Sequence, residues 1–95
     1  MSGPAFLAID LGAESGRAIV GRLSDTGVAL EEVHRFANEP VRVGSTLHWD
    51  VLRLWRDIRH GLGRALAIAG DDLVSIGVDT WGVDYGLLAA NDELL

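Results

Sequence analysis

The chain has 95 residues, of which 48% are hydrophobic and 23% are charged, and its formal net charge is −6. This composition indicates a folded domain with one small core. The absence of cysteine excludes a disulfide-stapled module and a cysteine-based metal site, and the acidic balance argues against non-specific nucleic-acid binding. The chain begins with neither a basic leader nor an apolar run long enough to cross a membrane, so the sequence predicts a soluble cytoplasmic protein.

Three strands are predicted in succession from the start of the chain. Residues 5–11 form a continuous apolar run, as in a strand that is buried on both faces. A short glycine turn leads to a second strand over 17–23, and the SDTG sequence at 24–27 is typical of a hairpin turn into a third strand over 28–36. The apolar alternation slips at Glu31-Glu32, which predicts a bulge. The short connections predict that all three strands are antiparallel.

One helix is predicted, after a loop over residues 37–49. Asp50 is suited to capping the first turn, and Gly70 is a natural stop. Gly61 and Gly63 either allow close packing on the sheet or only weaken the helix, by about 1 kcal/mol each relative to alanine. Between the two ends, apolar residues recur every three or four positions, at Val51, Leu54, Trp55, Ile58, Leu62, Leu66 and Ala69.

The isolated tryptophans and histidines carry no strong functional pattern. Trp49 and Trp55 flank the start of the predicted helix, and we expect both in the core. His34, His48 and His60 are not spaced as metal ligands, so the sequence does not predict a zinc site.

The last third of the chain predicts a return to strands. Residues 73–78 are apolar at alternate positions, and a strand that follows a crossover helix should pair in parallel. A further strand is predicted over 87–90, followed by a turn signal at Asn91-Asp92. The chain then ends in two leucines, which indicates a fold cut off before its closing element. The predicted class is α/β.

The DLGAESGR stretch predicts a phosphate-binding turn. Gly12 and Gly16 keep side-chain bulk away from backbone amides, and successive amides in a tight turn form a concavity for anions. Ser15 can donate a hydroxyl hydrogen bond to phosphate, and Arg17 can either contact a phosphate or simply face solvent on its strand. Asp10 would repel a phosphate directly, so its position favours a hydrated Mg²⁺ between the two.

A simpler interpretation of the same stretch remains open. The glycines could serve a plain hairpin turn by adopting positive φ angles, and the negative charge of Glu14 favours that alternative. The pattern is not a dinucleotide fingerprint, because a strand follows the turn where that motif needs a helix. It is not a P-loop either, because no lysine lies near it.

A second strand also ends in an acidic residue, within the stretch GVDTWGVD. If the strands over 5–11 and 73–78 are parallel neighbours, Asp79 and the first acidic residue share one sheet edge, where open α/β sheets bind ligands. Trp81 offers an apolar plate for a sugar face, Gly82 admits a hydroxyl close to the backbone, and Asp84 can accept hydrogen bonds. The alternative is a loop with a core tryptophan and two turn-forming acids.

Four stretches of the chain together resemble one protein family. They read AIDLGAESGRAIVGRL, EEVHRFANEPV, HWDVLRLW and SIGVDTWGVDYGLL, and they extend over residues 8–90. The DLGAESGR turn alone is similar to that of sugar kinases, actin and heat-shock-chaperone ATPases. With HRF after the hairpin and DTWGVD at the fourth strand, the chain resembles the rhamnulokinases of the FGGY carbohydrate-kinase family.

This resemblance implies a ribonuclease H-like, actin-like ATPase fold, with three antiparallel strands followed by a crossover helix and a parallel strand. Residues 1–95 would be the amino-terminal part of the first of two lobes, an incomplete domain. Family members transfer the γ-phosphate of ATP to the 1-hydroxyl of L-rhamnulose with Mg²⁺. ATP, this sugar and Mg²⁺ are therefore the implied ligands.

The resemblance also implies roles for particular residues. Asp10 would face the metal through water, Gly82 would contact the sugar, and the catalytic base would lie beyond Leu95. From their own chemistry and position, Trp81 and Asp79 are further candidates for contacting the sugar. We expect no kinase activity from these residues alone, because phosphoryl transfer depends on positioning and charge stabilisation that half a cleft lacks. The residues implied to bind ATP are Ala13, Glu14, Ser15, Gly16 and Arg17.

Two other functions stay open at this point. Another FGGY kinase, for xylulose, fuculose or glycerol, would share the fold, although DTWGVD differs from the glutamine- or glutamate-bearing loops typical of those enzymes. A nucleotide-binding or assembly module of the actin and heat-shock type would share the phosphate turn but has no reason to keep a sugar loop. Uncovered strands and apolar surface also predict self-association of the truncated chain.

Overall fold

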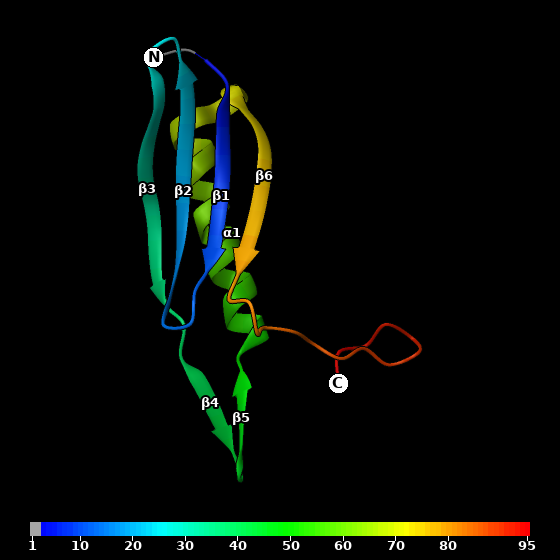
Figure 1. Ribbon diagram of the computed structural model, residues 1–95. Helices are drawn as coiled ribbons and strands as arrows, with labels where there is room; N and C mark the ends of the chain where they lie inside the picture. Colours follow the sequence, from blue (N-terminus) through cyan, green and yellow to red (C-terminus); the bar gives the residue numbers. More distant parts are fainter. Residues whose placement is uncertain (1–2) are drawn as a thin grey trace.

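The computed structural model describes residues 3–95, which form one sheet covered on one face by a helix, with a small hairpin beyond its end (Figure 1). The sheet order is β3-β2-β1-β6; β1 is antiparallel to β2, β2 is antiparallel to β3, and β6 is parallel to β1. The elements in chain order are β1 (Ala5–Leu11), β2 (Ser15–Ser24), β3 (Gly27–Ala37), β4 (Pro40–Val43), β5 (Thr46–Trp49), α1 (Val51–Ala69), the short 3₁₀ turn η1 (Gly70–Asp72) and β6 (Leu73–Thr80).

The core lies between α1 and one face of the sheet. Alternate residues of the two central strands point toward the helix, and Leu7 and Ile9 are each only 2% exposed. Small residues on α1 bring the helix axis close to these strands. The buried apolar cluster consists of Ala5, Leu7, Ile9, Ala18, Val20, Val33, Ala65 and Ala69.

The predicted α/β class and the succession of three antiparallel strands, a helix and a parallel strand are confirmed. The predicted bulge in the third strand is also confirmed, one residue further on. Ala18 pairs with His34 whereas Ile19 pairs with Glu32, so Val33 is the extra residue. A bulge of this kind turns the following side chains to the other face, and it directs His34 toward α1.

Both predicted ends of the helix are confirmed. The Asp50 carboxylate accepts a hydrogen bond from the Arg53 amide at 3.2 Å, and Gly70 ends the helix with a φ of +54°. The two interior glycines differ. A Cβ at Gly61 would lie 2.8 Å from the Cβ of Ala18, so Gly61 is needed for close packing on the sheet, whereas nothing lies within 4 Å at Gly63.

The predicted loop over 37–49 is wrong, because this segment contains the β4–β5 hairpin. Pro40 pairs with Trp49 and Val43 with Thr46, and Gly44 adopts a φ of +61° in the turn. Alternate valines at 41 and 43, followed by a Gly-Ser turn and the β-prone run Thr46–Trp49, are a hairpin pattern. The hairpin projects beyond the end of the main sheet (Figure 1).

The predicted strand over 87–90 is also wrong. Leu88 makes one isolated bridge with Leu94, and the amide of Leu95 donates to the carbonyl of Leu87 at 2.9 Å. The turn signal itself is confirmed, because Asp92 has a φ of +66° and the segment folds back on itself there. It does so away from the sheet (Figure 1), so within the described residues the apolar run has no strand of the sheet beside it to pair with.

The prediction that Trp55 lies in the core is wrong, since its side chain is 58% exposed. The helix presents Asp57, Gly61 and Ala65 to the sheet, and Trp55 lies outside that stripe. Trp49 is half-buried. Among residues 3–95, no helix is long and apolar enough to cross a membrane.

Candidate functional site

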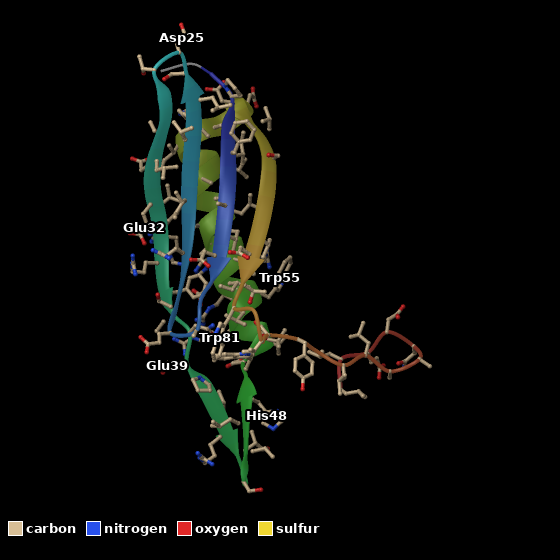
Figure 2. The ribbon with its side chains drawn as sticks, in the orientation of Figure 1. Asp25, Glu32, Glu39, His48, Trp55 and Trp81 are labelled. Atoms are coloured by element: carbon tan, nitrogen blue, oxygen red, sulfur yellow. The ribbon has the colours of Figure 1, made fainter. Side chains whose placement is uncertain are left out.

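The β1–β2 turn, the residue that follows β3 and the segment after β6 meet at the end of the sheet where β1 and β6 terminate. Because these strands are parallel, their carboxyl ends lie side by side, and Asp10 pairs with Asp79 in the strand register. The predicted meeting of the two acids at one edge is therefore confirmed. The Trp81 amide donates to the Leu11 carbonyl at 3.2 Å, which places Trp81 beside the β1–β2 turn (Figure 2).

The turn from β1 to β2 is a tight hairpin closed by the Gly12 amide, which donates to the Ser15 carbonyl at 3.0 Å. A Cβ at Gly12 would lie 2.8 Å from that carbonyl oxygen, so a side chain would prevent this closure. Neither Gly12 nor Gly16 adopts a positive φ, so the alternative that they serve as positive-φ turn residues is wrong. The amides of Ala13 and Glu14 are in exposed residues and donate to no protein acceptor within residues 3–95.

Asn38 fixes this turn from the end of β3. Its side-chain amide donates to the Gly12 carbonyl at 2.7 Å, and its backbone amide donates to the Glu14 carbonyl at 3.0 Å. Asn38 is only 7% exposed, so these bonds are shielded from water. The role of Asn38 is not predictable from the sequence, because nothing local to this residue signals a partner 26 residues away.

Gly16 is a glycine because Phe36 lies against it. A Cβ at this position would overlap the Phe36 ring, and Phe36 is only 8% exposed. The two residues are direct partners in the β2–β3 pairing. The second glycine of the motif therefore has a packing role of its own, in addition to any role in clearing space for a phosphate.

Asp10 and Arg17 form an ion pair across the hairpin. Arg17 Nη2 lies 2.7 Å from Asp10 Oδ2, with the side chains 41% and 33% exposed respectively. Within the part of the chain that the structure describes, Arg17 Nε is buried and has no hydrogen-bond partner. The pair places one cation and one carboxylate at the mouth of the turn, where each remains partly accessible to a ligand.

The segment after β6 is a short polar turn. The Thr80 hydroxyl donates to Asp84 Oδ2 at 2.7 Å, and the Asp84 amide donates to the Trp81 carbonyl at 2.8 Å. Asp84 is thus a turn-stabilising acid in this structure. Gly82 is exposed, and nothing lies within 4 Å of the position of its missing Cβ. Trp81 is 49% exposed, so the core alternative for this tryptophan is wrong.

An open groove of about 750 Å³ adjoins this turn. It lies between β5, the start of α1 and the segment after β6. Thr80 and Asp84 line it together with Trp49 and Leu54, whereas neither Gly82 nor the Gly12–Arg17 turn does. The groove therefore borders the segment after β6 without reaching the Gly12–Arg17 turn.

The fold and this edge define an α/β chain with two acid-bearing strand ends next to a glycine turn. The chain is 47% identical over 90 residues to a rhamnulokinase of Bacteroides thetaiotaomicron, an alignment that covers 95% of this chain and 18% of the relative. It is 43% identical over 89 residues to a rhamnulokinase of Oceanobacillus iheyensis and 40% identical over 90 residues to one of Bacillus subtilis. No family model matches the chain.

The three relatives are all rhamnulokinases, and this chain matches them at 40–47% identity over nearly its whole length. The resemblance to rhamnulokinases is thereby confirmed. The chain spans about a fifth of the length of these relatives.

Proposed function

We propose that this chain forms part of the ATP- and sugar-binding cleft of a kinase that phosphorylates L-rhamnulose at its 1-hydroxyl. One observation carries the proposal. The exposed amides of Ala13 and Glu14, which donate to no acceptor among residues 3–95, lie at the same sheet end as the neighbouring carboxylates of Asp10 and Asp79. Amides that can bind phosphate, placed beside oxygen ligands for a cation, are what a metal–nucleotide complex requires.

The proposed phosphate site extends from Ala13 to Arg17. The two free amides would bind phosphate oxygens, the Ser15 hydroxyl would add a hydrogen bond, and the Arg17 guanidinium would exchange part of its contact with Asp10 for a phosphate. Glu14 contributes its backbone and points its charge to solvent. Gly16 has no side chain, so the backbone of the turn packs directly against the Phe36 ring.

The residues present fit a hydrated Mg²⁺. Mg²⁺ retains several waters and is held by one or two carboxylates together with substrate phosphates. Asp10 and Asp79 supply neighbouring carboxylates at an accessible edge, and Asp10 would contact the ion through water. The ion supplies neutralisation of the phosphate charge when bound.

The proposed sugar site lies on the segment after β6. Gly82 leaves its backbone open to a hydroxyl group, Trp81 offers an exposed ring face, and Asp79 can accept a hydrogen bond from a sugar hydroxyl. We also propose that residues 1–95 form part of the first lobe of a ribonuclease H-like, cytoplasmic enzyme. The catalytic base would lie outside this chain.

A chimera tests the proposal. In it, this chain replaces the matching 90 residues of the Bacteroides thetaiotaomicron rhamnulokinase. We expect the chimera to release ADP with L-rhamnulose and Mg²⁺-ATP in a coupled assay, whereas the 95-residue chain alone gives no turnover because it lacks the base and the rest of the cleft. A folded chimera without activity, or turnover by the isolated chain, would contradict the proposal.

The same chimera separates the two other functions. Faster turnover of xylulose, fuculose or glycerol than of L-rhamnulose would favour another FGGY kinase. Calorimetry with the ketose alone should show heat of binding if Trp81 and Gly82 face a sugar. A nucleotide-dependent assembly module would show none.

A further inference from the structure

A cluster of potential metal ligands lies away from the proposed kinase site, between β3 and α1. It consists of His34 on β3 and of Asp57 and His60 on α1, whose ligand atoms all lie within 4.8 Å of one another. His34 Nε2 is 3.5 Å from Asp57 Oδ1. The sequence did not predict a zinc site, because the two histidines lack ligand spacing along the chain and only the fold brings them together.

Two backbone features create the cluster. The bulge at Val33 reverses the face on which the end of β3 presents its side chains, so His34 pairs with the buried Ala18 and points toward α1. Gly61 lets the helix approach this strand, since its missing Cβ would meet Ala18 at 2.8 Å and the His34 Cβ at 3.8 Å. Together these features place His34 close enough to α1 to share a metal ion with side chains of the helix.

The geometry suits a small transition-metal ion. Bonds of about 2.0–2.1 Å around a tetrahedral zinc put its ligand atoms about 3.4 Å apart, close to the separation of His34 from Asp57. The third ligand, His60, is exposed and can move the remaining distance by rotating its side chain. Two imidazoles with one carboxylate form a donor set that zinc accepts, with one position left for water.

Burial and charge also support binding. The side chains of His34 and Asp57 are only 12% and 9% exposed, so both are already held in place. The other oxygen of Asp57 lies 3.9 Å from the Arg56 guanidinium, which leaves Oδ1 free to face the histidines. The His34 ring is also 5.6 Å from that of Phe36, the residue that covers Gly16.

We propose that His34, Asp57 and His60 bind one zinc ion that links α1 to β3 near the β1–β2 turn. The ion would hold His34, and through it Phe36, against the wall of that turn. The site is distinct from the proposed Mg²⁺ position, because none of its three ligands belongs to the edge that carries Asp10 and Asp79.

Calorimetric titration of the metal-free 95-residue chain with zinc chloride tests this site. We expect one zinc per chain, and a zinc-dependent rise in Tm, because the ion binds the folded state. His60→Ala removes one ligand, so it should weaken binding by about tenfold or more and lower the rise in Tm at the same zinc concentration. The variant should still fold, because this exposed residue contributes little to packing. His48→Ala is the matched control, an exposed histidine on β5 that should bind zinc as the unmodified chain does.

Circular dichroism should show that His60→Ala and Asp57→Asn keep their helix, so that a loss of zinc binding is not a loss of folding. Co²⁺ added to the unmodified chain should give the intense visible absorption of a tetrahedral complex. No zinc binding by the unmodified chain, or equal binding by His60→Ala and His48→Ala, would overturn the proposal. Neither result would bear on the kinase assay of the chimera.

Discussion

Asp10→Asn in the chimera is expected to lower kcat/KM for ATP by about 10²–10³, because several kcal/mol of charge stabilisation at the phosphates depend on the ion that this carboxylate would hold. The amide that replaces it keeps the size of the side chain but is a poor ligand for hydrated Mg²⁺. Initial rates at varied Mg²⁺ concentration measure the effect, and the variant should require more Mg²⁺ to reach half its maximal rate.

Asp72→Asn is the matched control for this substitution. Asp72 also pairs with an arginine, since its Oδ2 lies 3.0 Å from Arg22 Nη1, and its side chain is 41% exposed. It precedes β6, whereas Asp10 lies level with the end of that strand, so the two ion pairs are at opposite ends of the sheet. Asp72→Asn should leave kcat/KM unchanged. Equal losses in both variants would mean that Asp10 acts through folding alone.

Gly16→Ala is expected to destabilise the 95-residue chain by about 1–3 kcal/mol, because the added methyl group and the Phe36 ring cannot occupy the same space. The ring would have to leave a site where it is 8% exposed and lies beside His34. For a domain of this size, each kcal/mol lowers Tm by roughly 4–8 °C. Thermal unfolding followed by circular dichroism measures the change.

Gly21→Ala tests whether this loss is particular to the turn. Gly21 lies in the same strand, and a Cβ there would make ordinary contacts, 3.4 Å from Leu30 and 3.7 Å from Val28. Its substitution should change Tm by no more than a few degrees. If Gly16→Ala proved as mild as Gly21→Ala, Phe36 would not restrict the turn, and the packing reason for this glycine would be wrong.

Local patterns in the sequence predicted most of the fold. The apolar run at 5–11, the SDTG turn and the capping pair Asp50 and Gly70 each depend on interactions within a few residues, and all of them are confirmed. The slip at Glu31-Glu32 located the bulge to within a residue for the same reason. The meeting of two acids at one edge followed from the parallel pairing of two strands.

Features that depend on distant contacts were missed. Asn38 holds a turn that lies 26 residues earlier, and His34 reaches Asp57 only because the helix packs on the bulged strand. Trp55 fits the apolar period of α1, but the smallest residues determine which side of that helix approaches the sheet. Periodicity describes one element at a time, so it cannot show which stripe of the helix its neighbours will cover.

The most direct test of the central claim is a crystal structure of the chimera with Mg²⁺, a non-hydrolysable ATP analogue and L-rhamnulose. We expect phosphate oxygens within hydrogen-bond distance of the Ala13 and Glu14 amides, a water-bridged Mg²⁺ at Asp10, and the sugar against Gly82. Phosphates bound elsewhere, with the Gly12–Arg17 turn facing only solvent, would contradict the account.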